Sequence, residues 1–175
     1  MKLNFSNKEV LISKTHPFSL NKDDIKIMQS FANLNSSNKS RICSHKNIED
    51  KLHEMFITHK KDYYVRPHRH FNKSESILIL KGNADLVLFN EKGDIQNIIQ
   101  LDEFSSGNIF YNRIDLPIFH SLIIKSNFLL FYEVTTGPLK VEDTEYAKWS
   151  PEIGSDKSVE FLNNIKKEIA KKSIL

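Results

Sequence analysis

Apolar residues near the N-terminus follow the period of a helix. The positions that recur at this spacing are Ile25, Met28, Phe31 and Ala32. Asn21 precedes them as a suitable N-cap, so the pattern predicts a helix over residues 22–34. A short apolar run predicts a strand at residues 8–13, and the polar residues 35–40 predict an exposed linker.

From about residue 62 the pattern changes to short apolar runs separated by turn signals. These runs are residues 76–82, 84–90, 95–101, 108–112, 121–126 and 128–134. Residues 90–94 favour a hairpin turn, and periodicity does not decide between helix and strand for residues 50–57. Closely spaced short strands with no long helix among them indicate a β-sandwich or barrel. The run 76–82 is apolar on both faces, so we expect the N-terminal segment or a second subunit to cover its outer face.

The last segment, residues 155–175, has the pattern of an amphipathic helix. Its apolar stripe consists of Val159, Leu162, Ile165 and Ile169. Lysines occupy much of the remaining surface. Basic amphipathic helices of this kind also occur on membrane surfaces. The stripe is short and lacks Trp, so we expect this helix to pack on its own barrel or on a partner subunit.

Composition excludes several classes of protein. The 175 residues are 39% hydrophobic and 27% charged, which suits one domain with modest additions. No apolar run approaches the roughly 20 residues needed to span a bilayer, and no secretory signal is visible, so we expect a cytoplasmic protein. The formal charge of +3 is small and mostly interspersed, which gives no reason to expect nucleic-acid binding. Cys43 is the only cysteine, so an internal disulfide is impossible.

The candidate chemistry lies in the stretch RPHRHFNKSESILILKG, residues 66–82. In an extended strand His68 and His70 point to the same face, and so does Arg66. Glu75 follows a short turn and can return to the same cavity, and His120, at the start of a later strand, is the best fourth ligand. Imidazole nitrogens and a carboxylate suit a divalent transition metal such as Zn, Fe, Mn, Co or Ni.

This spacing resembles the first motif of the cupin superfamily, in which H-x-H is followed by Glu and then by Gly. His68, His70, Glu75 and Gly82 stand at the matching positions. The glycine that usually precedes the first histidine is Asp62 here. In the second motif Pro117 stands where Gly is expected, and only His120 is kept. The resemblance implies a metal-binding β-barrel.

Within the superfamily the chain is most similar to the WbuC-type cupin-fold metalloproteins, from about Arg41 to Glu152. The landmarks that carry this likeness are RICSH, YVRPHRH, LFNEKG, FYEVTTGP and YAKWSPE. Cys43 replaces the usual Asn of the first landmark, and Phe119 replaces the Trp that commonly precedes the last histidine. Proteins of this type are often linked to surface-polysaccharide and O-antigen biosynthesis, so the resemblance implies a sugar-related ligand.

Further polar residues are candidates for binding and catalysis. Arg41 and His45 share one face of a predicted strand and can hold an anionic or polyhydroxylated ligand; the alternative is a surface pair that ties down the N-terminal segment. Arg66 can meet substrate or a carboxylate behind the metal ligands, and Tyr64, on the same face, is a candidate base or a core residue. Glu133 can act as a general base or form a buried ion pair with Arg41 or Arg66.

Three other side chains are interpreted structurally. We expect Lys73, in the turn between the ligands, to be exposed. Trp149 is expected to close the outer wall of the barrel, and Cys43 to line the cavity without being an activated thiol.

The sequence therefore predicts a mainly β protein with a cupin double-stranded β-helix, or jelly-roll, barrel. The predicted boundaries are a strand–helix segment at 1–40, the barrel at 41–152 and a helical tail at 153–175. The predicted function is that of a metal-binding cupin. The leading hypothesis is an isomerase- or epimerase-like enzyme that acts on a sugar or sugar-nucleotide intermediate of surface-polysaccharide synthesis. The alternatives are a non-catalytic, metal-dependent sugar-binding protein, an Fe-dependent dioxygenase, and a cupin kept as a scaffold without a metal. A homodimer is expected, because the outer strand faces are too apolar for solvent.

Overall fold

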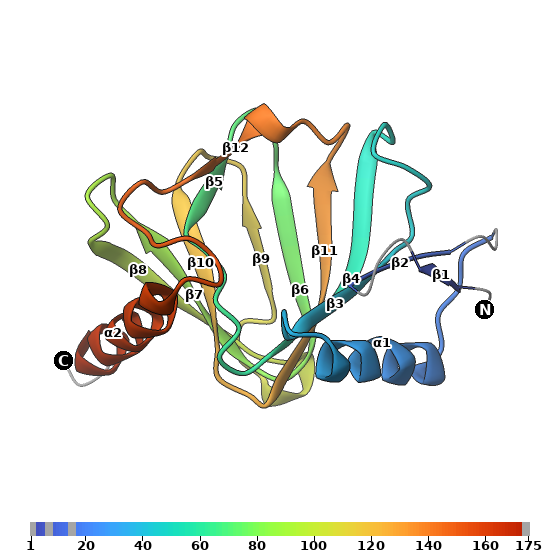
Figure 1. Ribbon diagram of the computed structural model, residues 1–175, viewed down its shortest axis with the longest axis horizontal. Helices are drawn as coiled ribbons and strands as arrows, with labels where there is room; N and C mark the ends of the chain where they lie inside the picture. Colours follow the sequence, from blue (N-terminus) through green and yellow to red (C-terminus); the bar gives the residue numbers. More distant parts are fainter. Residues whose placement is uncertain (1–2, 6–8, 14–16, 173–175) are drawn as a thin grey trace.

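Two antiparallel sheets face each other and enclose the main core (Figure 1). The computed structural model describes residues 3–5, 9–13 and 17–172, and for residues 3–5 and 13 only the backbone. The larger sheet has the strand order β1-β2-β3-β4-β11-β6-β9 and the smaller one β12-β5-β10-β7-β8. Only the pairing of β2 with β3 is parallel among these strands. This arrangement is a jelly-roll β-sandwich, as the sequence predicts.

The element bounds follow the apolar runs closely. The strands are β1 (Leu3–Phe5), β2 (Val10–Ser13), β3 (Lys39–Cys43), β4 (Leu52–Lys60), β5 (His68–His70), β6 (Glu75–Lys81), β7 (Ala84–Phe89), β8 (Ile95–Leu101), β9 (Tyr111–Ile114), β10 (Phe119–Ile124), β11 (Phe128–Thr136) and β12 (Thr144–Tyr146). The α-helices are α1 (Lys22–Leu34) and α2 (Asp156–Lys172), and single 3-10 turns occupy Phe104–Ser106 and Val141–Asp143.

The helix α1 has the predicted bounds, and its start is fixed by a reciprocal capping box between Asn21 and Asp24. The side chain of Asn21 accepts hydrogen bonds from the amides of Asp23 and Asp24, and Asp24 accepts one from the amide of Asn21. This capping box satisfies amides that have no partner inside the helix. The apolar side of α1 then packs on the outer face of the larger sheet, where Met28 contacts Ile42 and Leu11.

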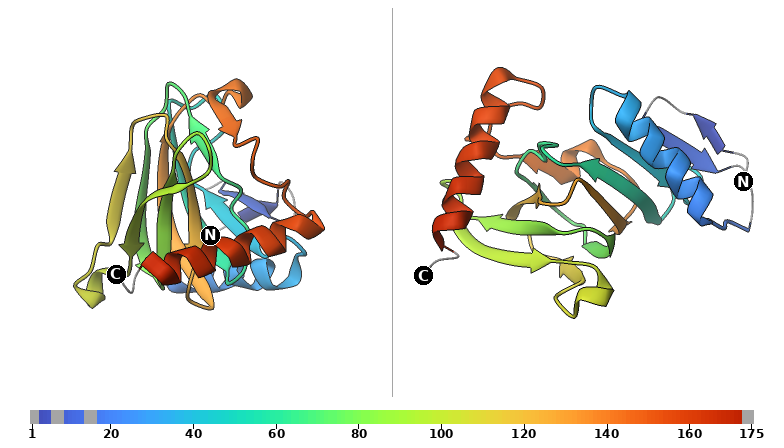
Figure 2. Two further views of the ribbon diagram at one scale, coloured as in Figure 1. Left: turned by 90° about the vertical axis from the view of Figure 1, so that its left-hand side faces the viewer. Right: turned by 90° about the horizontal axis from the view of Figure 1, so that it is seen from below.

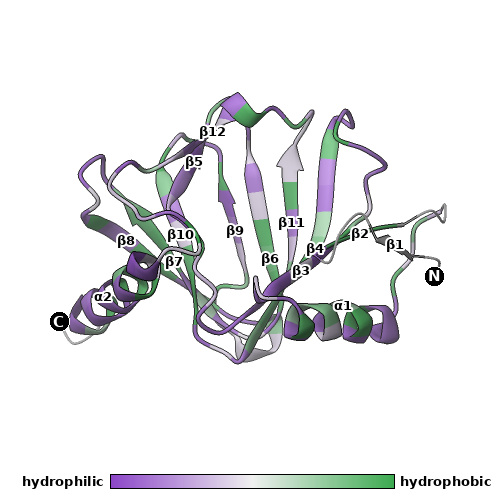
Figure 3. Ribbon diagram, viewed as in Figure 1, coloured by the Kyte–Doolittle hydropathy of each residue, from purple (hydrophilic) through white to green (hydrophobic). Residues whose placement is uncertain are grey.

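Three apolar layers hold the elements together. The first lies between the two sheets, and Phe131, Ile79 and Leu86 are among its buried members. The second lies between the smaller sheet and α2, and the third between the larger sheet and α1. Figure 2 shows the two helices on opposite sides of the strands, and Figure 3 shows that each helix has a hydrophobic and a hydrophilic side.

The strand β10 is buried on both faces for this reason. His120 and Leu122 point between the sheets, whereas Phe119 and Ile123 point toward α2. The expected packing of the C-terminal helix on its own barrel is therefore confirmed. Leu162, Ile165 and Ile169 are buried there, but Val159 is 64% exposed, so the predicted stripe is one residue too long.

Several expectations about local structure need correction. Residues 39–40 belong to β3 and Ser40 is buried, so the predicted exposed linker ends earlier. Residues 52–60 are a strand, and the strand expected at 108–112 lies at 111–114. The outer face of β6 is only partly covered, since Leu80 is 40% exposed although it lies beside α1.

The strand predicted at 8–13 is present from Val10, and residue 8 lies outside the described residues, as do 173–175 of the predicted tail. The strands β1 and β2 extend the larger sheet beyond β3. The boundaries 1–40, 41–152 and 153–175 remain a prediction. Within the described ranges no helix combines the length and the apolar character that a membrane crossing requires.

Candidate metal centre

The short strand β5 places His68 and His70 between the sheets. It lies between β10 and β12, and its first residue, His68, is paired with His120 on one side and Tyr146 on the other. Alternation along the strand turns Arg69 outward. Its guanidinium bonds Glu145 at 2.7 Å and Glu91 at 2.6 Å, and it covers the ring of Phe119 at 4.3 Å. These outward contacts fix the strand and hence the two inward rings.

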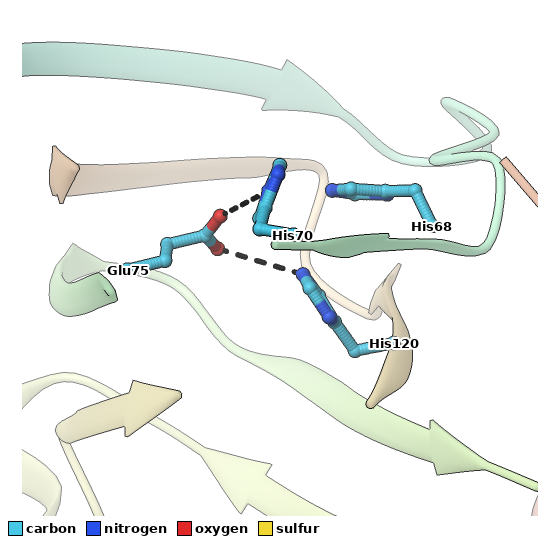
Figure 4. Close-up of side chains that lie close together, drawn as sticks. All are labelled: His68, His70, Glu75 and His120. Atoms are coloured by element: carbon cyan, nitrogen blue, oxygen red, sulfur yellow. Dashed lines mark hydrogen bonds and ion pairs between the residues drawn. The ribbon is translucent and has the colours of Figure 1, made fainter. Parts of the chain in front are cut away.

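Four side chains from three strands, two of the smaller sheet and one of the larger, meet at this point. His68 and His70 come from β5, Glu75 from the start of β6 and His120 from β10 (Figure 4). One candidate ligand atom from each of the four lies within 4.8 Å of all the others. Nε2 of His70 is 3.0 Å from one carboxylate oxygen of Glu75, and Nε2 of His120 is 3.8 Å from the other.

Hydrogen bonds on the far sides of the rings determine which nitrogen is available. Nδ1 of His68 lies 2.8 Å from the carbonyl oxygen of Arg66, and Nδ1 of His120 lies 2.9 Å from that of Ile118. A carbonyl only accepts, so each Nδ1 carries the proton and donates it. Each Nε2 then has a free lone pair directed toward the cluster, as metal-bound histidines require.

The protonation states also suit ligands. Burial, reinforced by the nearby His120, lowers the pKa of His68 to about 4, so its imidazole is neutral at neutral pH. Burial alone would raise the pKa of Glu75. The hydrogen bond from His70 and the electrostatic interactions with His120, His68 and His70 outweigh it, and the pKa of Glu75 falls to about 2. Glu75 is therefore a carboxylate.

His120 provides a test of whether a metal fits. Its ring is only 2% exposed, and its Nε2 is buried without a hydrogen-bond partner in the described part of the chain. An unsatisfied buried polar atom costs about 1–3 kcal/mol. A cation held among the four ligand atoms would satisfy this nitrogen, and three imidazoles with one carboxylate are a ligand set for Zn and similar ions. The residues present fit a divalent metal.

A cavity of about 450 Å³ leads to the cluster, and His68, His70 and Glu75 form part of its wall. Both Arg41 and His45 line it, as the sequence predicts, and so does Cys43. The guanidinium of Arg41 makes no hydrogen bond or ion pair with any residue that the structure describes. The surface pairing considered for Arg41 and His45 is therefore absent among those residues.

Glu133 also lines this cavity, on the inward face of β11. Its pKa lies well above the ordinary value, first because of burial and then because Glu75 is negative; Arg41 opposes this shift. Glu133 forms no ion pair with Arg41 or Arg66, and Arg66 is instead bonded to Ser150. The buried ion pair that the sequence suggested for Glu133 is thus not formed.

His45 lies at the cavity wall beside another histidine. Its ring stacks on that of His53 with centroids 4.2 Å apart and planes 14° apart, and its Nδ1 lies 3.2 Å from the backbone of Glu54. Burial, followed by repulsion from His53, lowers the pKa of His45. His45 is therefore a neutral group at the cavity wall and is not one of the four clustered ligands.

Tyr64 and Arg66 do not join the cluster. The ring of Tyr64 is buried under α2, where it meets Phe161, and its hydroxyl donates to the carbonyl of Pro151 at 3.1 Å. Burial raises the pKa of Tyr64 to about 12. Arg66 bonds the hydroxyl and carbonyl oxygens of Ser150. Pro67 separates Arg66 from the strand, so the alternation that put Arg66 on the ligand face does not apply.

Three of the residues near the cluster were not assigned to the site from the sequence. Thr144 places its hydroxyl 3.0 Å from Nδ1 of His70, and Tyr146 lies 6.0 Å from His68 between ring centroids. Lys73 lines the cavity, and its Nζ lies 3.9 Å from a carboxylate oxygen of Asp143. Its side chain is only 6% exposed, so the expectation that it is exposed is wrong. All three depend on the segment 141–146 folding back over β5, which nothing local in the sequence indicates.

Trp149 closes the outer wall as expected. Its indole packs against Phe89 and Phe119 of the smaller sheet and against Phe161 of α2. It therefore links the barrel to the C-terminal helix.

Comparison with known proteins supports the fold. A family model described as "Domain of unknown function (DUF6016)" matches residues 20–101, just under half of the chain. This region includes His68, His70 and Glu75 but ends before His120. A search among curated proteins gave no match.

Solved structures of similar shape include protein SO0799 from Shewanella oneidensis. It has a TM-score of 0.53 and 11% identity, over 73% of this chain and 85% of that one. CapF in complex with 3-isopropenyl-tropolone, described as an inhibitor, has a TM-score of 0.52 and 14% identity, over 64% of this chain and 32% of its own. The oxalate decarboxylase of Bacillus subtilis has a TM-score of 0.48 and 17% identity, over 62% of this chain and 27% of its own.

At such identities the similarity shows the fold alone. The chain spans most of the Shewanella protein but only about a third of CapF. Together, the sheet order and the inward cluster of three histidines and a glutamate give a jelly-roll fold with a candidate metal centre.

Proposed function

We propose that this protein is a metal-binding cupin in which His68, His70, Glu75 and His120 hold one divalent transition metal. The observation that carries the proposal is the buried Nε2 of His120, which has no hydrogen-bond partner among the described residues and faces the other three ligands. Zn, Fe, Mn, Co and Ni all accept this ligand set, and the choice among them depends on geometry and availability.

We further propose that the bound molecule is a sugar or sugar-nucleotide intermediate of surface-polysaccharide biosynthesis, transformed by isomerisation or epimerisation. The cavity of about 450 Å³ has the size of a small-molecule site and reaches three of the four ligands. When bound, a divalent metal polarises a carbonyl or hydroxyl oxygen of a substrate. The guanidinium of Arg41, which has no partner among the residues that the structure describes, supplies a donor for an oxygen-rich ligand.

Glu133 is the strongest candidate for proton transfer in such a reaction. It lies in the same cavity as the ligands, and a buried carboxyl whose pKa is raised well above its ordinary value is suited to accept and return a proton. His45 is the second candidate, because it is neutral and lines the same wall. Tyr64 is omitted, since its hydroxyl is directed to Pro151 away from the cavity.

The WbuC-type resemblance supports the choice of substrate class. Four of its landmarks contribute to the same cavity. YVRPHRH supplies the ligand histidines, RICSH supplies Arg41 and His45, FYEVTTGP supplies Glu133, and YAKWSPE supplies Tyr146. On this basis we propose a WbuC-type protein with a role in O-antigen synthesis, acting in the cytoplasm as a homodimer. The partly exposed outer face of β6, including Leu80, supports the homodimer.

The proposal is tested by elemental analysis of tag-free protein beside two double variants. His68→Ala/His70→Ala removes two ligands, whereas His45→Ala/His53→Ala removes two histidines of the same cavity that lie outside the cluster. We expect about one equivalent of metal in the parent and the control, and loss of metal in the ligand variant with the fold intact. A parent that holds no metal and takes up none of the five ions would overturn the proposal.

Substrate class is tested on the metal-loaded protein by deuterium exchange from solvent into candidate nucleotide sugars, followed by NMR. An isomerase or epimerase exchanges a carbon-bound proton, and Glu133→Gln should abolish this exchange while leaving metal content unchanged. Binding without exchange would support a sugar-binding protein instead, and oxygen consumption by the Fe-loaded form would support a dioxygenase.

A further inference from the structure

A second, smaller cavity lies beside the candidate metal centre. It measures about 210 Å³ and is bounded by β3, β4, residues 63–65 and residues 9–10 of the N-terminal segment. Val10, Arg41, His68 and Glu133 line both cavities, so the two adjoin at a ligand histidine. A molecule bound at the metal centre therefore has a neighbouring compartment for a second group.

Most polar side chains that line this second cavity are hydrogen-bond donors. His59 projects inward from β4, directly opposite Lys39 of β3 in the sheet register. The ring of Tyr63 lies 4.4 Å from the ring of His59 between centroids, and the ammonium of Lys39 lies 5.3 Å from that of Tyr63. Lys39, His59 and Tyr63 thus form a continuous polar wall next to Arg41.

His59 is an unexplained group in this wall. Its exposed fraction is only 9%, and its Nδ1 has no hydrogen-bond partner among the described residues. It takes no part in the metal cluster. A buried polar atom is normally paired with protein, water or a ligand. An imidazole that lines a cavity without a partner indicates that a bound group supplies one.

The charges in this cavity favour an anion. The ammonium nitrogen of Lys39 lies 3.5 Å from a carboxylate oxygen of Glu9, so these two charges offset each other. The guanidinium of Arg41 has no carboxylate partner among the residues described. A planar guanidinium matches the two oxygens of a carboxylate or phosphate. Ile57 and Val65 add apolar side chains to the lining.

From this arrangement we propose that the second cavity is an oxyanion subsite. It receives a carboxylate or phosphate group of the molecule whose other end reaches the metal centre, and Arg41, Lys39 and His59 are the residues that bind it. The inference rests on the proposed function for the metal-facing end. It narrows the substrate to one that carries an oxyanion within a few bonds of the atom beside the metal. A water molecule occupies about 30 Å³ of liquid, so 210 Å³ holds such a group and a few attached atoms.

The experiment is a titration of the full-length protein, with inorganic phosphate and with acetate in separate series. The ring ¹⁵N resonances of His59 report occupation of the subsite, and calorimetry reports affinity. Each titration is run on chelator-treated protein and again after reloading with stoichiometric Zn. The two probes distinguish a phosphate from a carboxylate as the group that is bound.

Two matched pairs of variants locate the anion. Arg41→Gln and Lys39→Gln each remove a charge from the subsite. Arg113→Gln removes an exposed arginine on β9, and Lys46→Gln removes a lysine that lines only the larger cavity. We expect one probe to saturate and shift the His59 resonances, with affinity reduced about tenfold or more by the subsite variants and less than about twofold by the controls.

Three outcomes would overturn the subsite. These are no binding of either anion, an equal loss in Lys46→Gln, and binding that needs Zn while leaving the His59 resonances unmoved. The last outcome would place the anion on the metal and leave the proposed function standing. Conversely, binding at His59 in a protein that takes up no metal would support the subsite and overturn the proposed metal centre.

Discussion

The hydroxyl oxygen of Thr144 lies 3.0 Å from Nδ1 of His70, on the side of the ring opposite the Nε2 that faces Glu75. Thr144 belongs to β12 and is paired with His70 in the strand register. The same strand therefore supports the backbone of β5 and sets the ring orientation of one proposed ligand. Hydrogen bonds behind metal ligands commonly tune affinity as well as orientation.

Replacing Thr144 by Val should weaken metal binding. The substitution keeps the shape of the side chain and removes the hydroxyl, so the His70 ring loses the contact that orients it. We expect an affinity about 10–100-fold lower for Zn, measured by competition with a chromogenic chelator. Thr135→Val is the control, because Thr135 lines the same cavity and makes no side-chain hydrogen bond to the cluster. Equal losses in the two variants would show that the hydroxyl of Thr144 has no specific role.

Gly82 is expected to be needed for the fold rather than for the metal. Its φ is +86°, and a Cβ added there would overlap the carbonyl oxygen of Phe128 and the side chain of Ser126. Gly107 has a similar φ of +77° but open space around it. Gly107→Ala should cost about 1 kcal/mol from backbone strain alone, and Gly82→Ala about 3 kcal/mol because the clash is added. Urea unfolding of the metal-free proteins measures both, and equal values would contradict the role given to the close approach.

His59 should make the metal-free protein sensitive to acid. Burial, followed by repulsion from Lys39 and Arg41, lowers the pKa of His59 from 6.5 to about 3 in the folded state. The unfolded chain therefore binds a proton below about pH 6.5 that the folded chain does not. Stability is present above that pH and declines as the pH falls toward 3.

The variant His59→Gln should lose less stability on acidification. Between pH 7 and pH 5 the parent should lose about 2 kcal/mol more unfolding free energy than the variant, because one titrating group has been removed. Urea unfolding at both pH values, without added phosphate or carboxylate, checks this. Parallel losses would mean that His59 titrates normally in the fold.

The helix α2 should stabilise the barrel through one side only. Leu162 is 4% exposed between α2 and the smaller sheet, whereas Val159 is 64% exposed on the same helix. Leu162→Ala should reduce the free energy of unfolding by about 2–5 kcal/mol, and Val159→Ala should change it by less than about 0.5 kcal/mol. A large effect at Val159, with a change in sedimentation, would indicate that this face is covered by a second subunit.

The parts predicted well from the sequence are those that depend on local periodicity. The helix at 22–34 follows from the spacing of Met28 and its neighbours together with Asn21 as a cap. The cluster was predictable because alternation in β5 puts His68 and His70 on one side, and because the turn before Glu75 is short.

The parts that were missed depend on pairings between distant segments. Arg66 was placed on the ligand face, but Pro67 interrupts the alternation and Ser150 holds its guanidinium. Lys73 is covered because residues 141–146 return to β5 more than 60 residues later in the chain. The second cavity was not predicted, because Lys39 and His59 become neighbours only through the register of β3 with β4. A pattern within one strand carries no information on which other strand lies beside it.

The position of β5 between β10 and β12 has a consequence for protein synthesis. A nascent chain exposes His68 and His70 about 50 residues before His120 is made, and the second neighbour of their strand is complete only at Tyr146. Until then the two histidines have neither the third imidazole nor the hydroxyl of Thr144. Capture of the proposed ion by the full set would therefore be a late event in biogenesis. A chain that stops short of Thr144 would leave the ribosome with its first two proposed ligands on an unsupported edge.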